Sequence, residues 1–379
     1  MTTDLRSVPA DRVLDLGLGD PAHPMPRAVS EVLRRLADRP SFGYAPPGGL
    51  PVLRRELAEK LVRVNGIDAT GREVVVTNGA SQAITAALAT LCAPGGTVLV
   101  PEPGYPAYRA ACRSLGLRTA GYRVDGTGPD WDGLARAAPG AAVLLWNFPA
   151  NPTGTVADPT WYPRLYALLA EHRQLTVVSD EVYEELCFDA AHRSPAAGAG
   201  RSADRFVSVF SFSKGQAMTG FRVGYAHARA ELAARIARTH YALSMSVSTV
   251  SQLCALAVLR AGGDHPASHR GALLDGRDRL VAGLRAAGLR VDTPRAGCFA
   301  WPDVSVSGLD AGTWCRTLAL RLRVLAVPGT EFGPGSGGRA RLSFAVPAQD
   351  LAEAVRRIGT WAAEGWAADH APAAPGGVR

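Results

Sequence analysis

Lys214 is the residue of this chain whose type and place most clearly indicate catalysis. The 379 residues contain 41 Lys+Arg, but only Lys60 and Lys214 are lysines. Lys214 ends the apolar run "FVSVFSFSK". Arginine stays protonated, whereas a desolvated lysine can become a neutral amine that attacks a carbonyl carbon. The sequence therefore predicts a nucleophilic lysine at 214. The alternative is a surface lysine, which the apolar residues before it disfavour.

Hydroxyl groups and an arginine accompany Lys214. Ser211 and Ser213 precede it in "SFSK", and Arg222 follows eight residues later in "GFRVGY". An arginine can grip a phosphate through two parallel hydrogen bonds, and serine hydroxyls can add further donors. These residues predict a phosphate-binding site, against the alternative of a surface salt bridge for Arg222.

The segment "TNGASQAI" predicts a second part of the same anion site. A strand turns through Gly79 into a helix whose first turn holds Ala80 and Ser81. Unpaired N–H groups and the helix dipole favour an anion at such a terminus. Taken alone, the segment favours the alternative, a plain helix cap by Asn78 or Ser81.

A carboxylate, an amide and two aromatic rings follow other apolar runs. Asp180 and Tyr183 lie in "SDEVYEEL", Asn151 in "NFPANPTG" and Tyr105 in "PGY". A buried carboxylate needs a partner, such as a cationic ring nitrogen. Tyr183 could donate to a phenolate oxygen, and Tyr105 could stack on a flat cofactor. The alternatives are a helix cap for Asp180, a tight loop around Asn151 and a core position for Tyr105.

Apolar runs that alternate with helical patterns must position these side chains. Such runs are typical of a mostly parallel sheet covered by helices on both faces, the α/β class. Ligands of these sheets bind at the carboxyl ends of the strands, so we expect the polar groups at one rim. The runs cover residues 74–78, 97–105, 141–149, 175–183 and 206–214.

The remaining segments suggest a second, smaller domain. Residues 28–38 have a helical pattern, and residues 229–290 are predicted to form two long helices broken near "AGGDHP". The C-terminal part predicts a small α+β unit that ends in the helix "AQDLAEAVRRIGTWAAE". We expect an N-terminal segment (1–40) that joins this small domain (286–366), a large cofactor-binding domain (41–285) and a disordered tail (367–379).

Composition excludes several classes of protein. The net charge is +7, but the arginines are dispersed and no basic block appears, so no nucleic-acid partner is predicted. No apolar run reaches the length of a membrane span, and the first residues lack the apolar core of a signal peptide. The 6 cysteines are scattered without a CxxC pair, which favours free thiols in the cytoplasm and predicts no metal site.

In combination and in this order, "NPTG", "DEVY" and "SFSK…GFRVGY" are highly specific. From "GLGDP" to "RLSFA" the chain resembles the class I/II aminotransferases of the aspartate aminotransferase superfamily, the fold-type I pyridoxal-phosphate enzymes. The resemblance implies an enzyme that transfers an amino group between an amino acid and a 2-oxo acid. It also implies pyridoxal 5'-phosphate as cofactor, a large domain with a seven-stranded type of sheet, and a homodimer with shared active sites.

The resemblance also assigns a role to each residue. Lys214 is implied as the Schiff-base lysine and proton shuttle, and Asp180 as the partner of the pyridine nitrogen. Asn151 and Tyr183 would bond the cofactor's 3-oxygen, and Tyr105 would stack on its ring. The phosphate cup would comprise Ala80, Ser81, Ser211, Ser213 and Arg222, together with Tyr44 of the neighbouring subunit. Arg341 in "ARLSFA" would bind the substrate carboxylate, with Gly19 and Asn151 lining the substrate site.

Two departures from the family pattern bear on specificity. Glu331 in "PGTEFG" stands where a small or apolar residue is usual, and Ala300 where an aromatic ring is common. Glu331 could turn outward or pair with an arginine, or it could meet a basic substrate side chain. A lyase or cyclase that uses the same cofactor is the alternative function. A cofactor-sensing regulator is disfavoured because no helix-turn-helix precedes residue 40.

Overall fold

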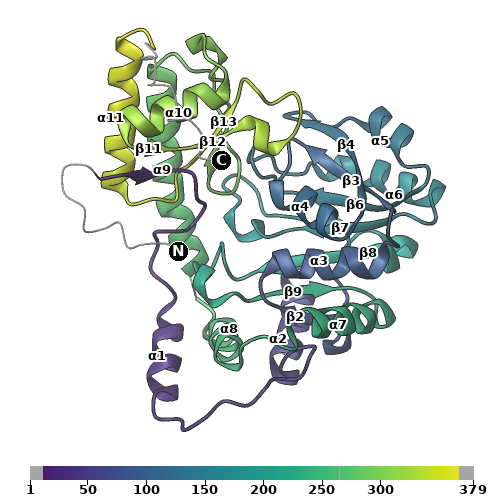
Figure 1. Ribbon diagram of the computed structural model, residues 1–379. Helices are drawn as coiled ribbons and strands as arrows, with labels where there is room; N and C mark the ends of the chain where they lie inside the picture. The colour runs from purple at the N-terminus through teal and green to yellow at the C-terminus, as the bar shows by residue number, and fades with distance from the viewer. Residues whose placement is uncertain (1–11, 264, 367–379) are drawn as a thin grey trace, which may run out of the picture. The chain divides into compact units, whose positions relative to one another are not determined.

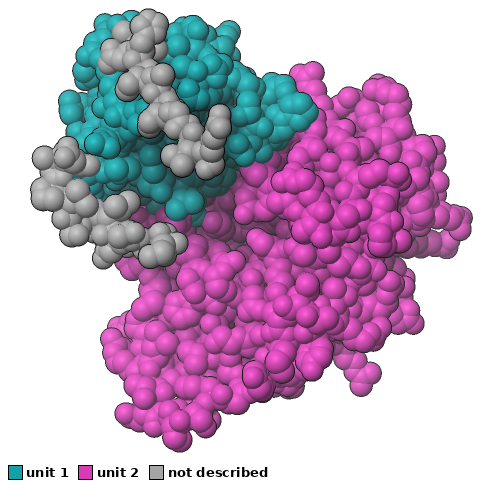
Figure 2. All heavy atoms as spheres, viewed as in Figure 1, with its two compact units in different colours: residues 1–19, 275–293, 299–379 teal, residues 20–274, 294–298 magenta. Residues whose placement is uncertain are grey.

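The computed structural model describes residues 12–263 and 265–366. Two compact units account for them, and Figure 2 colours each one separately. The larger unit comprises residues 20–274 and 294–298, and the smaller one takes the described parts of 1–19, 275–293 and 299–379. The domain boundaries predicted after residues 40, 285 and 366 stay predictions, and the predicted disordered tail lies outside the described residues.

The larger unit is built on a mostly parallel sheet, as the apolar runs predict. Among the described residues its eight strands follow the order β2-β9-β8-β7-β6-β3-β4-β5, which can be traced from β4 to β2 in Figure 1. β9 is antiparallel to both of its neighbours, and β5 is antiparallel to β4. The strands are β2 (Val74–Thr77), β3 (Thr97–Glu102), β4 (Arg118–Asp125), β5 (Gly128–Pro129), β6 (Ala141–Asn147), β7 (Thr176–Asp180), β8 (Phe206–Ser211) and β9 (Gly224–His227).

Side chains of the central strands alternate between two separate cores. In β6, Val143 and Leu145 belong to one apolar cluster, and Leu144 and Trp146 to the other. Because successive strand residues face opposite sides, both faces of the sheet must be covered. Residues of α3, α4 and α7 complete the first cluster, and residues of α2, α5, α6 and α8 the second.

The helices of the larger unit connect and cover these strands. They are α1 (Arg27–Leu36), α2 (Pro51–Lys60), α3 (Ala80–Leu91), α4 (Pro106–Ser114), α5 (Trp131–Ala137), α6 (Tyr162–Glu171), α7 (Ala230–Ser244) and α8 (Thr249–Ala261). A short π-helix (Leu61–Asn65) continues α2, and single 3-10 turns cover Gly71–Glu73, Pro159–Trp161, Glu184–Leu186, Gly200–Arg205 and Thr219–Phe221. α9 (His265–Ala286) begins in the larger unit.

The prediction of two long helices over 229–290 is wrong, because the described residues there form three. The first predicted helix is interrupted after α7, where Met245 adopts φ 59° and ψ −71°, a conformation that an α-helix cannot continue. Ser248 then caps α8 by accepting a hydrogen bond from the Ser251 backbone N–H. The predicted break near "AGGDHP" does separate α8 from α9.

The smaller unit joins the N-terminal strand to C-terminal elements. β1 (Leu14–Asp15) pairs in parallel with β11 (Val324–Leu325), and β13 lies between β10 and β12. The other elements are β10 (Phe299–Ala300), α10 (Ala311–Leu322), β12 (Val327–Pro328), β13 (Ala340–Ser343) and α11 (Ala348–Ala363), with 3-10 turns at Ser305–Ser307 and Gly329–Phe332. Across the described ranges, no helix is long and apolar enough to cross a membrane.

Candidate active site

The five apolar runs form β2, β3, β6, β7 and β8, and these strands point in one direction. β3, β6, β7 and β8 are mutually parallel, and β2 shares their direction because β9 is antiparallel to both β2 and β8. The polar segments that follow these strands therefore lie at one edge of the sheet. This edge is the usual place for a ligand in an α/β fold.

Asp180, at the end of β7, is a buried acid held by Tyr108. The Tyr108 hydroxyl donates to Oδ2 of Asp180 at 2.6 Å, and both side chains are buried. The Val182 backbone N–H donates to Oδ1 at 3.3 Å. Burial raises the pKa of Asp180 to about 6, although the Tyr108 hydrogen bond and the charge of Lys214 act in the opposite direction. A cation placed beside this carboxylate would recover its ionisation.

The loop after β6 is tied to the same strand end. Asn147 donates from Nδ2 to the Asp180 carbonyl oxygen at 3.1 Å, and its Oδ1 accepts from the Asn151 backbone N–H at 3.0 Å. Asn151 and Tyr183 are both buried. The structure thus brings Asn151 to the end of the strand that carries Asp180.

Tyr105 stands next to Tyr108, one turn of chain earlier. The two rings meet edge to face, with 5.5 Å between their centroids. Tyr105 precedes Pro106, the first residue of α4. Proline is favoured there because the backbone N–H at this position would make no helical hydrogen bond. The half-buried ring of Tyr105 therefore contacts Tyr108, the residue that donates a hydrogen bond to Asp180.

Gly79 and Arg222 form the predicted anion site together with the start of α3. Gly79 adopts φ 79° at the N-cap, and no side chain described in the structure caps the helix. A Cβ at Gly79 would lie 2.7 Å from Nη2 of Arg222, so only glycine permits the guanidinium to approach. Arg222 is itself held in the left-handed region by a hydrogen bond from Nη1 to the Thr219 carbonyl at 3.0 Å.

The residues around this helix terminus complete the predicted cup. The plain-cap alternative for Asn78 and Ser81 is wrong, because Asn78 instead donates from Nδ2 to Oγ of Ser244 at 3.0 Å and Ser81 is exposed. The Ser213 backbone N–H donates to Oγ of Ser211 at 3.0 Å, which fixes the turn before Lys214. Lys214 follows directly and is half-buried.

Arg341 and Gly19 belong to the smaller unit. Arg341 is buried in β13, donates from Nη2 to the Gly17 carbonyl at 2.7 Å and stacks on Phe299, with 3.9 Å from its Cζ to the ring centroid. The N-terminal "GLGDP" segment and the arginine are thus in direct contact. Glu331 in the same unit is exposed, which agrees with the outward alternative, and Ala300 is buried.

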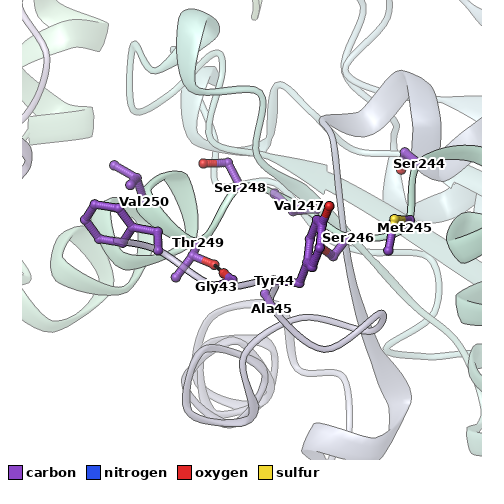
Figure 3. Close-up of a pocket in the computed structure, with 11 residues that line it drawn as sticks. Gly43, Tyr44, Ala45, Ser244, Met245, Ser246, Val247, Ser248, Thr249 and Val250 are labelled. Carbon is purple, nitrogen blue, oxygen red and sulfur yellow. Dashed lines mark hydrogen bonds between the residues drawn. The ribbon is translucent and has the colours of Figure 1, made fainter. Parts of the chain in front are cut away.

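Tyr44 lies apart from these groups, on an exposed loop of the larger unit. It is 84% exposed and lines a cavity of about 560 Å³ between residues 42–45 and 244–250. Figure 3 shows Tyr44 beside Ser246, and a hydrogen bond of 2.8 Å from Thr249 to the Gly43 carbonyl joins the two segments. The hydrogen bond between Asn78 and Ser244 links this cavity wall to the anion site.

Tyr108 and Asn147 are the site residues that the sequence reasoning missed. Asn147 belongs to the quoted segment "NFPANPTG", whereas Tyr108 lies three residues beyond the quoted "PGY". Neither residue type by itself predicts a hydrogen bond to Asp180. Tyr108 lies three residues after Tyr105, so the two side chains share one face near the start of α4. That spacing was the signal available in the sequence.

Most of the chain matches known aminotransferases. The profile of the family "Aminotransferase class I and II" matches residues 11–358. The aspartate/prephenate aminotransferase of Thermus thermophilus is 33% identical over 90% of this chain and 89% of its own length. The arginine–pyruvate transaminase of Pseudomonas aeruginosa is 32% identical over 93% and 91%.

Solved structures agree with these sequence matches. A double mutant of the Thermus thermophilus aspartate aminotransferase superposes with a TM-score of 0.85 and 33% identity, over 92% of this chain and 91% of the other. A methionine aminotransferase from Escherichia coli gives a TM-score of 0.86 and 30% identity over 92% and 94%. The chain belongs to the class I and II aminotransferases. It is an enzyme that transfers amino groups, as the resemblance implies, and the lyase or cyclase alternative is not favoured.

Proposed function

We propose that this aminotransferase uses pyridoxal 5'-phosphate and moves the amino group of an α-amino acid to a 2-oxo acid. The observation that carries the proposal is Asp180, a buried carboxylate at the same sheet edge as Lys214 and the Arg222 anion site. Burial raises its pKa to about 6, so a further cation beside it would favour the ionised form. A protonated pyridine ring fits that requirement, and a phosphate fits the start of α3.

Each residue at this edge has a defined task. When bound, the cofactor supplies an electron sink that stabilises negative charge on the substrate carbon. Lys214 holds the cofactor covalently and then moves the proton at Nζ. Asp180, oriented by Tyr108, stays ionised beside the ring nitrogen. Asn151 and Tyr183 bind the ring oxygen, and Tyr105 stacks on the ring face.

The phosphate is bound by a helix terminus and one guanidinium. Backbone N–H groups at Ala80 and Ser81 point away from the helix body and remain without a side-chain cap in the described chain. Arg222 adds charge and two donors, and Ser211 and Ser213 flank the turn that leads to Lys214. This arrangement orients the cofactor from its phosphate end.

Arg341 recognises the substrate carboxylate. The guanidinium of Arg341 packs over the rings of Phe299 and Phe332, and these contacts preorganise it for two parallel hydrogen bonds to a carboxylate. Gly19 is close in sequence to Gly17, whose carbonyl accepts a bond from Arg341. The family resemblance assigns substrate binding to Gly19 and, in the larger unit, to Asn151. Substrates are therefore α-amino acids and 2-oxo acids, in keeping with relatives named for aspartate, arginine and methionine.

The active enzyme is a homodimer with shared sites, located in the cytoplasm. Tyr44, Phe42 and Met245 form an exposed apolar group around the cavity, an unfavourable surface for a monomer. A hydrogen bond from Asn78 to Ser244 connects the cavity wall with the anion site. A second copy of the chain that docks on this cavity would therefore bring its Tyr44 towards the phosphate. The cytoplasmic location is supported by six free cysteines.

The test is a single half-reaction without acceptor. Purified, cofactor-loaded protein is mixed with one amino acid at a time, and the cofactor and 2-oxo acid are quantified by chromatography. Transamination predicts one pyridoxamine phosphate and one 2-oxo acid per active site. Ammonia or carbon dioxide released in equal amount, without the amine form, would instead show a lyase or decarboxylase.

A further inference from the structure

The two residues directly after Lys214 are held by a side chain from another strand end. Gln216 is buried and donates from Nε2 to Oε1 of Glu185 at 2.8 Å. Glu185 lies in the 3-10 turn Glu184–Leu186, which follows β7 and Asp180. One hydrogen bond thus connects the segment that carries the ring-nitrogen partner with the segment that carries the lysine.

Gly215 leaves the space that Glu185 needs. A Cβ at Gly215 would overlap Oε2 of Glu185 and lie 2.7 Å from its Cβ. The backbone of Gly215 is outside the left-handed region, so its φ does not require glycine. Glycine at 215 is therefore explained by the close approach of the carboxylate rather than by backbone conformation.

The carbonyl of Gly215 is held by a side chain of α9. Nδ1 of His269 lies 3.2 Å from the Gly215 carbonyl oxygen, and because a carbonyl only accepts, Nδ1 carries the proton. His269 is buried, and its neighbour Arg270 donates to the Glu185 carbonyl at 3.3 Å. Glu185 and His269 therefore enclose the peptide that follows Lys214.

We propose that Glu185 is a positioning residue for Lys214, which holds the backbone after the lysine so that Nζ meets the reacting carbon. The proposal rests on the function proposed above for Lys214. It deepens that function by naming a side chain that acts through the backbone after Lys214. A misplacement of about 1 Å at a reacting group can cost about 10²-fold in rate.

A pair of complementary substitutions tests this contact. Glu185→Ala removes the support and Gly215→Ala displaces it, so each should lower kcat about 10- to 100-fold with little change in KM. In the double variant the methyl of residue 215 occupies the space that the carboxylate leaves. We expect it to recover at least about tenfold over either single variant. Glu185→Gln keeps the length and an acceptor oxygen and should stay within about threefold of the unmodified protein.

The matched control is Gly220→Ala in the same loop. A methyl carbon at Gly220 would meet no neighbouring atom within 4 Å, and the residue is exposed, so this variant should be unchanged. A second measurement does not require the cofactor. It follows the amide hydrogen exchange of the peptide that spans residues 206–221 in cofactor-free protein. Exchange should be faster in Glu185→Ala and return towards the original rate in the double variant.

Two results would overturn the positioning role. One is Glu185→Ala with unchanged kcat and unchanged exchange. The other is a double variant whose loss equals the product of the single losses, because independent effects multiply. An unmodified protein that lacks transaminase activity would contradict the proposed function instead, and the exchange measurement would still decide whether Glu185 holds the loop.

Discussion

The two lysines of this arginine-rich chain occupy contrasting surroundings. Lys60 is almost fully buried, forms an ion pair with Glu184, donates to Oδ1 of Asn65 at 2.8 Å and lies over the ring of Phe210. Lys214 is half-buried in a turn at the ligand-binding edge of the sheet. The same residue type is therefore fixed in a buried ion pair at one position and, in the proposed function, carries the chemistry at the other.

Electrostatics separates the two positions further. Burial, the largest single influence, lowers the pKa of Lys60, but the interactions with Glu184, Tyr225 and Glu185 together outweigh it and raise that pKa above its ordinary value. A lysine held so firmly as a cation cannot act as a nucleophile. Lys214 lies instead near Asp180, whose pKa responds to its charge. The ion pair with Glu184 therefore separates Lys60 from the lysine that is proposed to react.

The largest effect should come from Lys214→Arg. Arginine keeps the charge but cannot form the covalent link, so kcat/KM should fall on the order of 10³-fold or more. Steady-state kinetics with the best amino acid substrate measures the loss, and the melting temperature checks that the fold persists. Activity within tenfold of the unmodified enzyme would remove Lys214 from its assigned role.

The second largest effect should come from Asp180→Asn, which should lower activity and raise stability. An amide cannot hold a protonated ring nitrogen, so kcat should fall on the order of 10²-fold or more. The folded-state pKa of about 6 exceeds the ordinary 3.8, so the folded protein binds this proton more tightly than the unfolded chain. The stability that this proton contributes is complete below pH ~4 and is lost as pH rises through about 6.

The variant should therefore be the more stable protein at neutral pH when cofactor is absent. The expected gain is about 3 kcal/mol near pH 7, and it should vanish near pH 4. Urea unfolding of both cofactor-free proteins at the two pH values measures it. A pH-independent difference would mean that Asp180 has an ordinary pKa in the folded state.

Lys60→Met should affect stability rather than chemistry. Removing one partner leaves Glu184 with an uncompensated charge, which costs about 3–5 kcal/mol for a buried pair. Adding Glu184→Gln should recover part of that loss, because the isolated charge is then gone. Urea unfolding of the single and double variants checks this. Equal stability of Lys60→Met and the unmodified protein would show that the ion pair contributes nothing.

The smallest effect should come from Lys60→Arg. The guanidinium can keep both the ion pair and the ring contact with Phe210, so the stability change should stay below about 1.5 kcal/mol. Activity should stay within about twofold. Comparison with Lys214→Arg makes the contrast direct, since the same substitution is nearly silent at one lysine and abolishes activity at the other. A large loss of activity at Lys60 would end that contrast.

The sequence predicted the strands well because buried parallel strands are continuous apolar runs. It did not predict β4, since "RTAGYRVD" lies near the sheet edge and only two of its eight residues are buried. Lys214, Asp180 and Arg222 could be identified because their residue types carry chemistry at strand ends. Tyr108 and Glu185 could not, because their roles depend on partners 72 and 31 residues away.

The most direct test is to reduce the cofactor-loaded protein with borohydride and locate the adduct by peptide mass spectrometry. Because the chain has only two lysines, the result distinguishes them without ambiguity. The adduct should lie on the peptide that contains Lys214, at close to one per chain, with the Lys60 peptide unmodified. An adduct on Lys60, or a yellow protein that loses its cofactor after reduction, would contradict the assignment of Lys214.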